Sequence, residues 1–95
     1  MAITGFANQA TTDVAQGVNS KHSRTIDQKA WKVAQRKLDL LNSIASLNDL
    51  KGEGNKLHAM KEKPGYHSLR VNDKYRLVFK FEDGNVKDVA ITDYH

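Results

Sequence analysis

The strongest constraint on the fold is an alternation of apolar and polar side chains through the last third of the chain. Residues 66–71, 75–81 and 86–94 each repeat with a period of two, which indicates half-buried β-strands. Asn72-Asp73 and Asp83-Gly84 separate these segments, and Asp-Gly is a strong signal for a two-residue hairpin turn. The three segments therefore predict an antiparallel meander.

A helix is expected to cover the apolar face of this sheet. Its apolar residues recur at alternating spacings of 3 and 4, the period of an amphipathic helix. They are Trp31, Ala34, Leu38, Leu41 and Ala45. Thr25 or Asp27 can cap this helix, since hydroxyl and carboxylate side chains accept from the first free amides.

The chain before this helix predicts smaller elements. Residues 8–16 form a short helix that stops at Gly17, and residues 3–6 form an edge strand. Residues 18–24 and 48–55 are polar or glycine-rich, so loops are expected there. The predicted fold class is α+β, with an N-terminal strand and two helices packed on an antiparallel sheet that ends in a three-strand meander. Residues 1–95 are expected to form a single domain.

Composition limits the classes of function. With 39% hydrophobic and 27% charged residues, the chain is predicted to be globular rather than disordered. The absence of cysteine excludes disulfides and thiolate metal sites. No apolar run is long enough for a membrane span, and the first residues lack the basic and apolar regions of a signal peptide. A cytoplasmic location with no membrane partner is expected.

Positive charge is concentrated in one segment. The net charge is +4, from 15 basic and 11 acidic residues. Residues 51–80 contain eight basic and three acidic residues, so this segment carries +5 and the rest of the chain −1. A polyanion is the partner expected for such a segment, although a lysine-rich solvated face would give the same count.

Five residues provide the groups needed to cut RNA without a metal: His58, Arg76, Asp93, Tyr94 and His95. An imidazole or carboxylate can accept the 2′-hydroxyl proton, a guanidinium can stabilise the phosphate, and an aromatic ring can stack on a base. Each residue also has an ordinary interpretation. Arg76 can face solvent from a strand, His58 can be a surface residue, and the last three residues can be a frayed terminus. Alternation predicts that Asp93 and His95 project together and that Tyr94 points the other way.

A metal site is not predicted. His22, His58, His67 and His95 lack the spacing of metal ligands, and we expect His67 to be structural. The sequence contains neither a glycine-rich phosphate loop nor a serine nucleophile motif, so no cofactor is predicted.

The chain resembles the HigB group of bacterial toxins, within the RelE/ParE superfamily of type II toxin–antitoxin proteins. The resemblance rests on Asn55-Lys56-Leu57-His58, on Tyr75-Arg76-Leu77 and on the closing Asp93-Tyr94-His95, and it extends over essentially the whole chain. A further match is Gly65 to Asn72. Relatives often carry Pro-Leu-Lys-Gly where this chain has Ala59-Met60-Lys61-Glu62, so a negative charge is added near the predicted phosphate site.

The resemblance implies an endoribonuclease that cuts mRNA in the ribosomal A site without a metal and leaves a 2′,3′-cyclic phosphate. It implies catalytic roles for His58, Arg76, Asp93, Tyr94 and His95, with Lys61 as a supporting cation. Lys56, Lys61, Arg70 and Lys74 are the residues predicted to bind substrate. The implied partners are the ribosome, mRNA and a HigA-like helix-turn-helix antitoxin, through which DNA is bound only indirectly.

Two other functions remain open. A ParE-like inhibitor of DNA gyrase has the same fold, although such chains generally lack the closing Asp-Tyr-His. A non-catalytic RNA-binding module would use Tyr66, Tyr75 or Tyr94 as stacking platforms. We also predict that the antitoxin binds the helical face rather than filling the basic cleft.

Overall fold

The computed structural model describes residues 2–52 and 54–93 of the chain, and its element order is that of an α+β fold. Two α-helices precede the sheet: α1 (Gln9–Gln16) and α2 (Gln28–Ser43). The strands are β1 (His58–Ala59), β2 (Tyr66–Arg70), β3 (Tyr75–Glu82) and β4 (Asn85–Asp93). Short 3₁₀ turns occupy Ser23–Thr25 and Leu47–Leu50. The predicted fold class is therefore confirmed.

The sheet is fully antiparallel in the order β1-β2-β3-β4, so each strand pairs with the next one in sequence. The last three strands are the predicted meander. The N-terminal segment lies beside β4 through two isolated parallel bridges, Ile3 to Val86 and Phe6 to Val89. The predicted N-terminal strand is thus present as two bridging residues rather than as a continuous strand.

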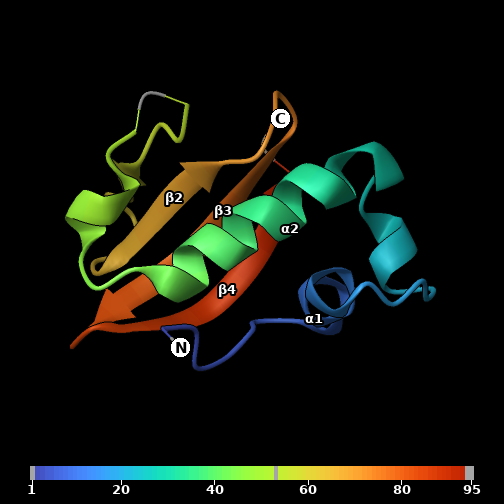
Figure 1. Ribbon diagram of the computed structural model, residues 1–95, viewed down its shortest axis with the longest axis horizontal. Coiled ribbons are helices and arrows are strands. Elements are labelled where there is room, and N and C mark those ends of the chain that lie inside the picture. Colours follow the sequence, from blue (N-terminus) through green and yellow to red (C-terminus); the bar gives the residue numbers. More distant parts are fainter. Residues whose placement is uncertain (1, 53, 94–95) are drawn as a thin grey trace.

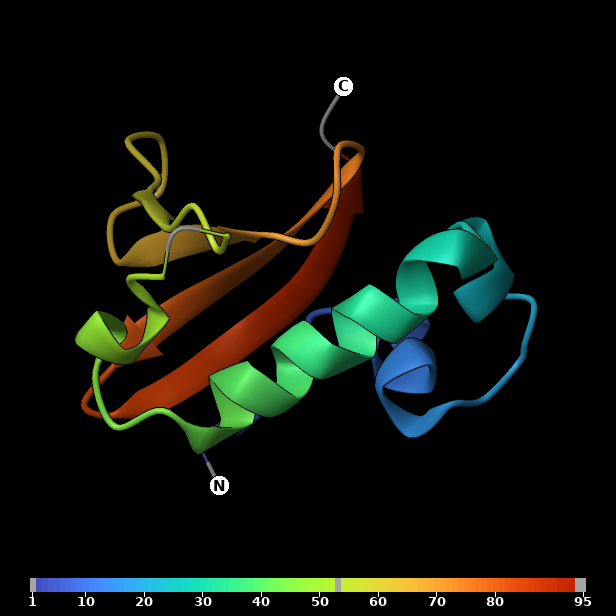
Figure 2. The same ribbon diagram turned by 45° about the horizontal axis from the view of Figure 1, so that its top comes forward.

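Helix α2 covers one face of the sheet (Figures 1 and 2). Asp27 caps it by accepting from the Lys29 amide at 3.1 Å, whereas Thr25, the other predicted cap, lies in the preceding 3₁₀ turn. Its buried face consists of Ala30, Ala34, Leu38 and Leu41. The sheet residues that complete the core include Leu69, Leu77, Phe79, Val89 and Ile91. The apolar stripe of the helix is therefore core, as its period predicts.

The end of α2 differs from the prediction. Ala45, expected on the buried stripe, is exposed and lies beyond the helix, which ends at Ser43. The Asp49 carboxylate accepts from the amides of Ala45 and Ser46, at 2.8 and 3.1 Å. The Asp49 carboxylate thus completes the capping box of the Leu47–Leu50 turn, and the amides of Ala45 and Ser46 bond to it instead of continuing the helix. The predicted loop over residues 48–55 accordingly begins with part of a 3₁₀ turn.

Helix α1 is attached to both the second helix and the sheet. Asn8 caps it, and Gly17 ends it in the left-handed region at φ 72°, a conformation that costs glycine little. Thr11 is fully buried, and its hydroxyl accepts from the Ile91 amide of β4 at 3.0 Å. The Gln35 side chain on α2 donates to the Val14 carbonyl at 2.9 Å.

The face of the sheet opposite α2 carries the candidate site.

Candidate functional site

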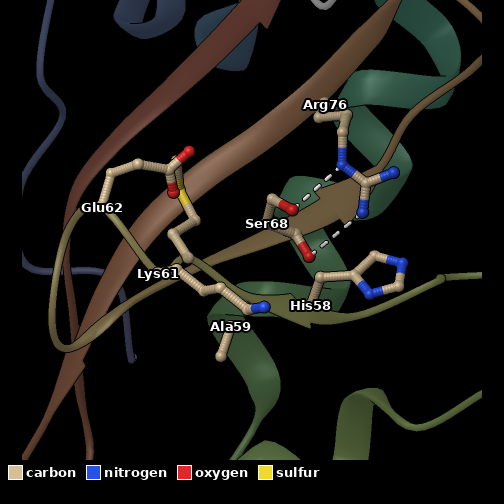
Figure 3. A pocket seen from close by; sticks show the side chains of 7 residues that line it. His58, Ala59, Lys61, Glu62, Ser68 and Arg76 are labelled. Atoms are coloured by element: carbon tan, nitrogen blue, oxygen red, sulfur yellow. Dashed lines mark hydrogen bonds between the residues drawn. The ribbon is translucent and has the colours of Figure 1, made fainter.

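A pocket of about 470 Å³ lies on the sheet face opposite α2 (Figure 3). The residues that line it are His58, Ala59, Met60, Lys61, Glu62, Ser68 and Arg76. They come from β1, the loop after it, β2 and β3. The volume lies within the range of roughly 300–1,000 Å³ that is usual for ligand-binding clefts. Three predicted site residues, His58, Lys61 and Arg76, thus meet at one pocket.

Arg76 projects from β3, an interior strand of the sheet, and its guanidinium donates to acceptors on Ser68 and Lys56. Its Nε donates to the Ser68 hydroxyl at 3.0 Å, and one terminal nitrogen donates to the Ser68 carbonyl at 3.4 Å. The same terminal nitrogen donates to the Lys56 carbonyl at 2.5 Å. These three contacts orient the guanidinium, and a rigid strand holds its base.

His58 and Lys61 are exposed side chains, the first on β1 and the second in the loop that follows it. His58 lies in β1, where its register partner is Ser68. The Met60 amide donates to the Tyr66 carbonyl at 2.9 Å and closes the loop that carries Lys61. Backbone hydrogen bonds therefore hold the segment that carries His58 and Lys61 beside the pocket.

The segment before His58 is anchored through Asn55. Its amide oxygen accepts from the Lys37 ammonium at 2.5 Å, and its amide nitrogen donates to the Leu50 carbonyl at 3.3 Å. Lys56 follows in the left-handed region at φ 45°, a strained conformation for a lysine. Burial lowers the pKa of Lys37, and the charges of Arg36 and Arg70 lower it further. Asn55 therefore connects α2 to the backbone that contacts Arg76.

Asp93 is not among the residues that line the pocket. It pairs with Tyr75 at the end of β4, whereas Thr92 is the residue opposite Arg76. Its carboxylate lies 3.9 Å from the Lys74 ammonium. Tyr94 and His95, the other two residues of the predicted terminal trio, lie outside the described residues.

The predicted substrate-binding residues have different environments. Lys56 contributes its carbonyl to Arg76 while its side chain is exposed. Arg70 lies in register with Arg76 and forms a salt bridge with Asp73. Of the four, only Lys61 lines the pocket.

The three tyrosines considered as stacking platforms have different environments. Tyr75 is 4% exposed, and its hydroxyl accepts from the Asp27 amide at 3.0 Å, so its proposed stacking role is wrong. Tyr66 donates to the Asp88 carboxylate at 2.8 Å, which raises the pKa of the phenol. The Lys63 ammonium lies 4.9 Å from the centre of the Tyr66 ring. Tyr94 is outside the described residues.

Ser68 is a site residue that the sequence analysis missed. It is 3% exposed and contacts Arg76 through both its hydroxyl and its carbonyl. The hairpin register places Arg70 opposite Arg76, so Ser68 lies diagonal to Arg76 on the same face of the sheet. Counting the register back from the Asn72-Asp73 turn would have found this proximity.

His67 lies on β2 with its ring stacked on Phe79 at a centroid distance of 6.0 Å. This packing agrees with the structural role expected for it. Within residues 2–52 and 54–93, no three histidine or acidic side chains are grouped closely enough to hold a metal ion. The described helices include none with the length and apolar character needed to cross a bilayer.

Comparison with known proteins places this geometry in a family. Residues 15–95 match the family described as the RelE-like toxin of type II toxin-antitoxin system HigB. An uncharacterized protein of Haemophilus influenzae is 36% identical over 72 residues, which cover 74% of this chain and 70% of that protein.

Two solved structures share the fold. The YoeB-YefM complex from Staphylococcus aureus is similar with a TM-score of 0.61 and 29% identity, over 98% of this chain and 94% of that chain. The YoeB dimer from Staphylococcus aureus gives the same TM-score of 0.61 with 27% identity, over 100% of this chain and 97% of that chain. Since the family match spans most of the sequence and the fold agrees, the chain belongs to the HigB family of RelE-like toxins of type II toxin–antitoxin systems.

Proposed function

We propose that this toxin is a ribosome-dependent endoribonuclease that cuts mRNA by attack of a 2′-hydroxyl on the adjacent phosphate. The observation that carries the proposal is the convergence of His58, Lys61 and Arg76 on one open pocket. His58 and Lys61 are near each other in sequence, whereas Arg76 lies on β3, and the pairing of β1, β2 and β3 brings it to them. An imidazole beside two cations is suited to phosphoryl chemistry.

In the proposed reaction the bond between O2′ and phosphorus forms while the bond between phosphorus and O5′ breaks. A base removes the proton of the 2′-hydroxyl, and an acid protonates the departing O5′. The products are a 2′,3′-cyclic phosphate and a 5′-hydroxyl. His58, Asp93 and His95 are the candidates for base and acid, and the resemblance assigns no order among them.

The cations of the pocket have a distinct role in this proposal. Arg76 and Lys61 stabilise the negative charge that builds on the phosphate in the transition state. Lys56, Arg70 and Lys74 contact neighbouring phosphates in this proposal, and such contacts orient the message without reading its sequence. Tyr94 stacks on a base. The substrate supplies the nucleophile, its 2′-hydroxyl, and the protein supplies the cations that stabilise the phosphate. The proposed mechanism therefore uses no metal.

We further propose that a HigA-like antitoxin of helix-turn-helix type inhibits this toxin by binding the helical face. Support comes from the YoeB toxin, which is known in complex with YefM. Helix α2 and the pocket lie on opposite faces of the sheet, so an antitoxin on α2 would leave the pocket open. A co-structure in which antitoxin residues fill the space between His58 and Arg76 would contradict this arrangement.

The test is to combine purified toxin with ribosomes that carry a defined message and to map the fragment ends. The proposal predicts cleavage at the A-site codon, a 2′,3′-cyclic phosphate end, and persistence of cleavage in excess chelator. A parallel supercoiling assay with DNA gyrase examines the alternative. Gyrase inhibition with intact mRNA would replace the nuclease by a ParE-like poison, and RNA binding without cleavage would replace it by a binding module.

A further inference from the structure

Ser68 occupies a buried position between the two strands that flank it. Its register partners are His58 on β1 and Val78 on β3, and only 3% of its surface is exposed. Strand interiors favour β-branched and aromatic residues, so a serine here has no advantage from propensity. A buried hydroxyl is instead expected to have a polar partner, and in this case the partner is the guanidinium of Arg76.

The geometry of that contact fixes the plane of the guanidinium. The Ser68 hydroxyl accepts from Nε at 3.0 Å, and the Ser68 carbonyl accepts from a terminal nitrogen at 3.4 Å. One residue thus contacts two donors of the planar group. The Lys56 carbonyl accepts from the same terminal nitrogen and limits rotation about the last bonds of the side chain.

We propose that Ser68 is a positioning residue, which holds the Arg76 guanidinium in the orientation that contacts the transferring phosphate. This inference rests on the proposed function, since it assigns Ser68 a part in RNA cleavage. Ser68 orients Arg76 before substrate binds, so the enzyme does not reorganise this charge during the reaction. The carbonyls of Lys56 and of residue 68 still accept from Arg76 after substitution of the Ser68 side chain. The hydroxyl contact to Nε can therefore be removed alone.

The first test is single-turnover and steady-state cleavage on programmed ribosomes by Ser68→Ala and Ser68→Thr. Ser68→Ala is expected to lower kcat by about 10- to 100-fold, because small misplacements of a catalytic group have effects of this order. KM should change by less than about threefold, because ground-state binding of the ribosome is unaffected. Ser68→Thr keeps the hydroxyl and should recover most of the rate.

Two further variants serve as controls for the Ser68→Ala rate. Ser68→Cys preserves the size of the side chain but provides a weak acceptor, so it should resemble Ser68→Ala even if the alanine variant folds poorly. Ser43→Ala removes an exposed hydroxyl that donates to the Leu40 carbonyl of its own helix, and its rate should equal that of the wild type. Wild-type kcat in both Ser68→Ala and Ser68→Cys would overturn the positioning role while leaving the nuclease intact.

A second measurement does not depend on cleavage. The ¹H–¹⁵N signal of Arg76 Nε, identified by its loss in Arg76→Lys, reports the hydrogen bond to Ser68 directly. Faster hydrogen exchange of this signal in Ser68→Ala and normal exchange in Ser68→Thr are expected. If the wild-type protein cut no RNA, the proposed function would fail, and this signal would still decide whether Ser68 fixes Arg76. Unchanged exchange in Ser68→Ala would overturn the contact itself.

Discussion

Replacing Asn55 with alanine should destabilise the fold more than the loss of an ordinary loop residue. The substitution removes the acceptor of Lys37 Nζ, at 2.5 Å, and the donor to the Leu50 carbonyl, at 3.3 Å. The first bond is charge-assisted, and Lys37 is partly buried, which already lowers its pKa. Without Asn55 the ammonium loses this partner in a partly buried position.

The expected loss follows from the two bonds. A neutral hydrogen bond contributes about 1 kcal/mol, and a bond to a charged group about 1.5–3 kcal/mol. We take the lower end for Lys37, because it is only partly buried, and expect a total of about 2–3 kcal/mol. For a domain of this size, each kcal/mol lowers the melting temperature by about 4–8 °C, so a decrease of about 10 °C or more is expected.

Urea denaturation of a double-mutant cycle measures this effect. The matched variant is Lys37→Met, which keeps the packing of the stem and removes only the donor. In the Lys37→Met background, Asn55→Ala should cost only about 1 kcal/mol, since the charged bond is already absent. Strict additivity of the two substitutions, or a loss below about 0.5 kcal/mol for Asn55→Ala alone, would refute the reasoning.

Three other perturbations have defined outcomes. Hydrogen bonds from Ser20 and then Gln9 hold the pKa of Asp13 below its ordinary 3.8, so its contribution is present above that pH and is lost as the pH falls through the folded-state pKa. Acid denaturation monitored by circular dichroism should therefore show a shallower loss of stability for Asp13→Asn than for the wild type. Tyr75→Phe removes the contact with the Asp27 amide and should lower the free energy of unfolding by about 0.5–1.5 kcal/mol in urea titrations. An unchanged value would mean that this contact is neutral. Lys74→Ala should reduce single-turnover cleavage by less than about tenfold, because a phosphate contact outside the reacting group contributes binding rather than catalysis. A loss as large as that of Arg76→Ala would place Lys74 in the catalytic set.

Periodicity was sufficient to predict the meander and the helix that covers it. Leu77 and Phe79 alternate with Arg76 and Val78, and burial of both apolar residues follows from a period of two. The end of α2 was not predictable in this way, since the Asp49 carboxylate competes for the amides of Ala45 and Ser46. Local side-chain acceptors of this kind override the helical period.

The candidate site was predicted in part. His58, Lys61 and Arg76 were selected for their chemistry, and strand pairing brings them to one pocket. The hydrogen-bond partner of the Tyr75 hydroxyl was not predicted, because the Asp27 amide is remote in sequence. The place of Asp93 also depends on a register that one sequence does not specify: β4 contains a bulge, in which Asp88 adopts φ 51°.

The most direct measurement of the central claim is the single-turnover rate of mRNA cleavage on programmed ribosomes for wild-type toxin, Arg76→Ala and His58→Ala. The account predicts fragments that end in a 2′,3′-cyclic phosphate and a decrease of about 10²-fold or more for Arg76→Ala, the loss expected from removing one transition-state charge contact. His58→Ala should also slow cleavage, and His95→Ala should be as severe as Arg76→Ala. Cleavage by Arg76→Ala and His58→Ala at the wild-type rate would show that this pocket is not where the message is cut.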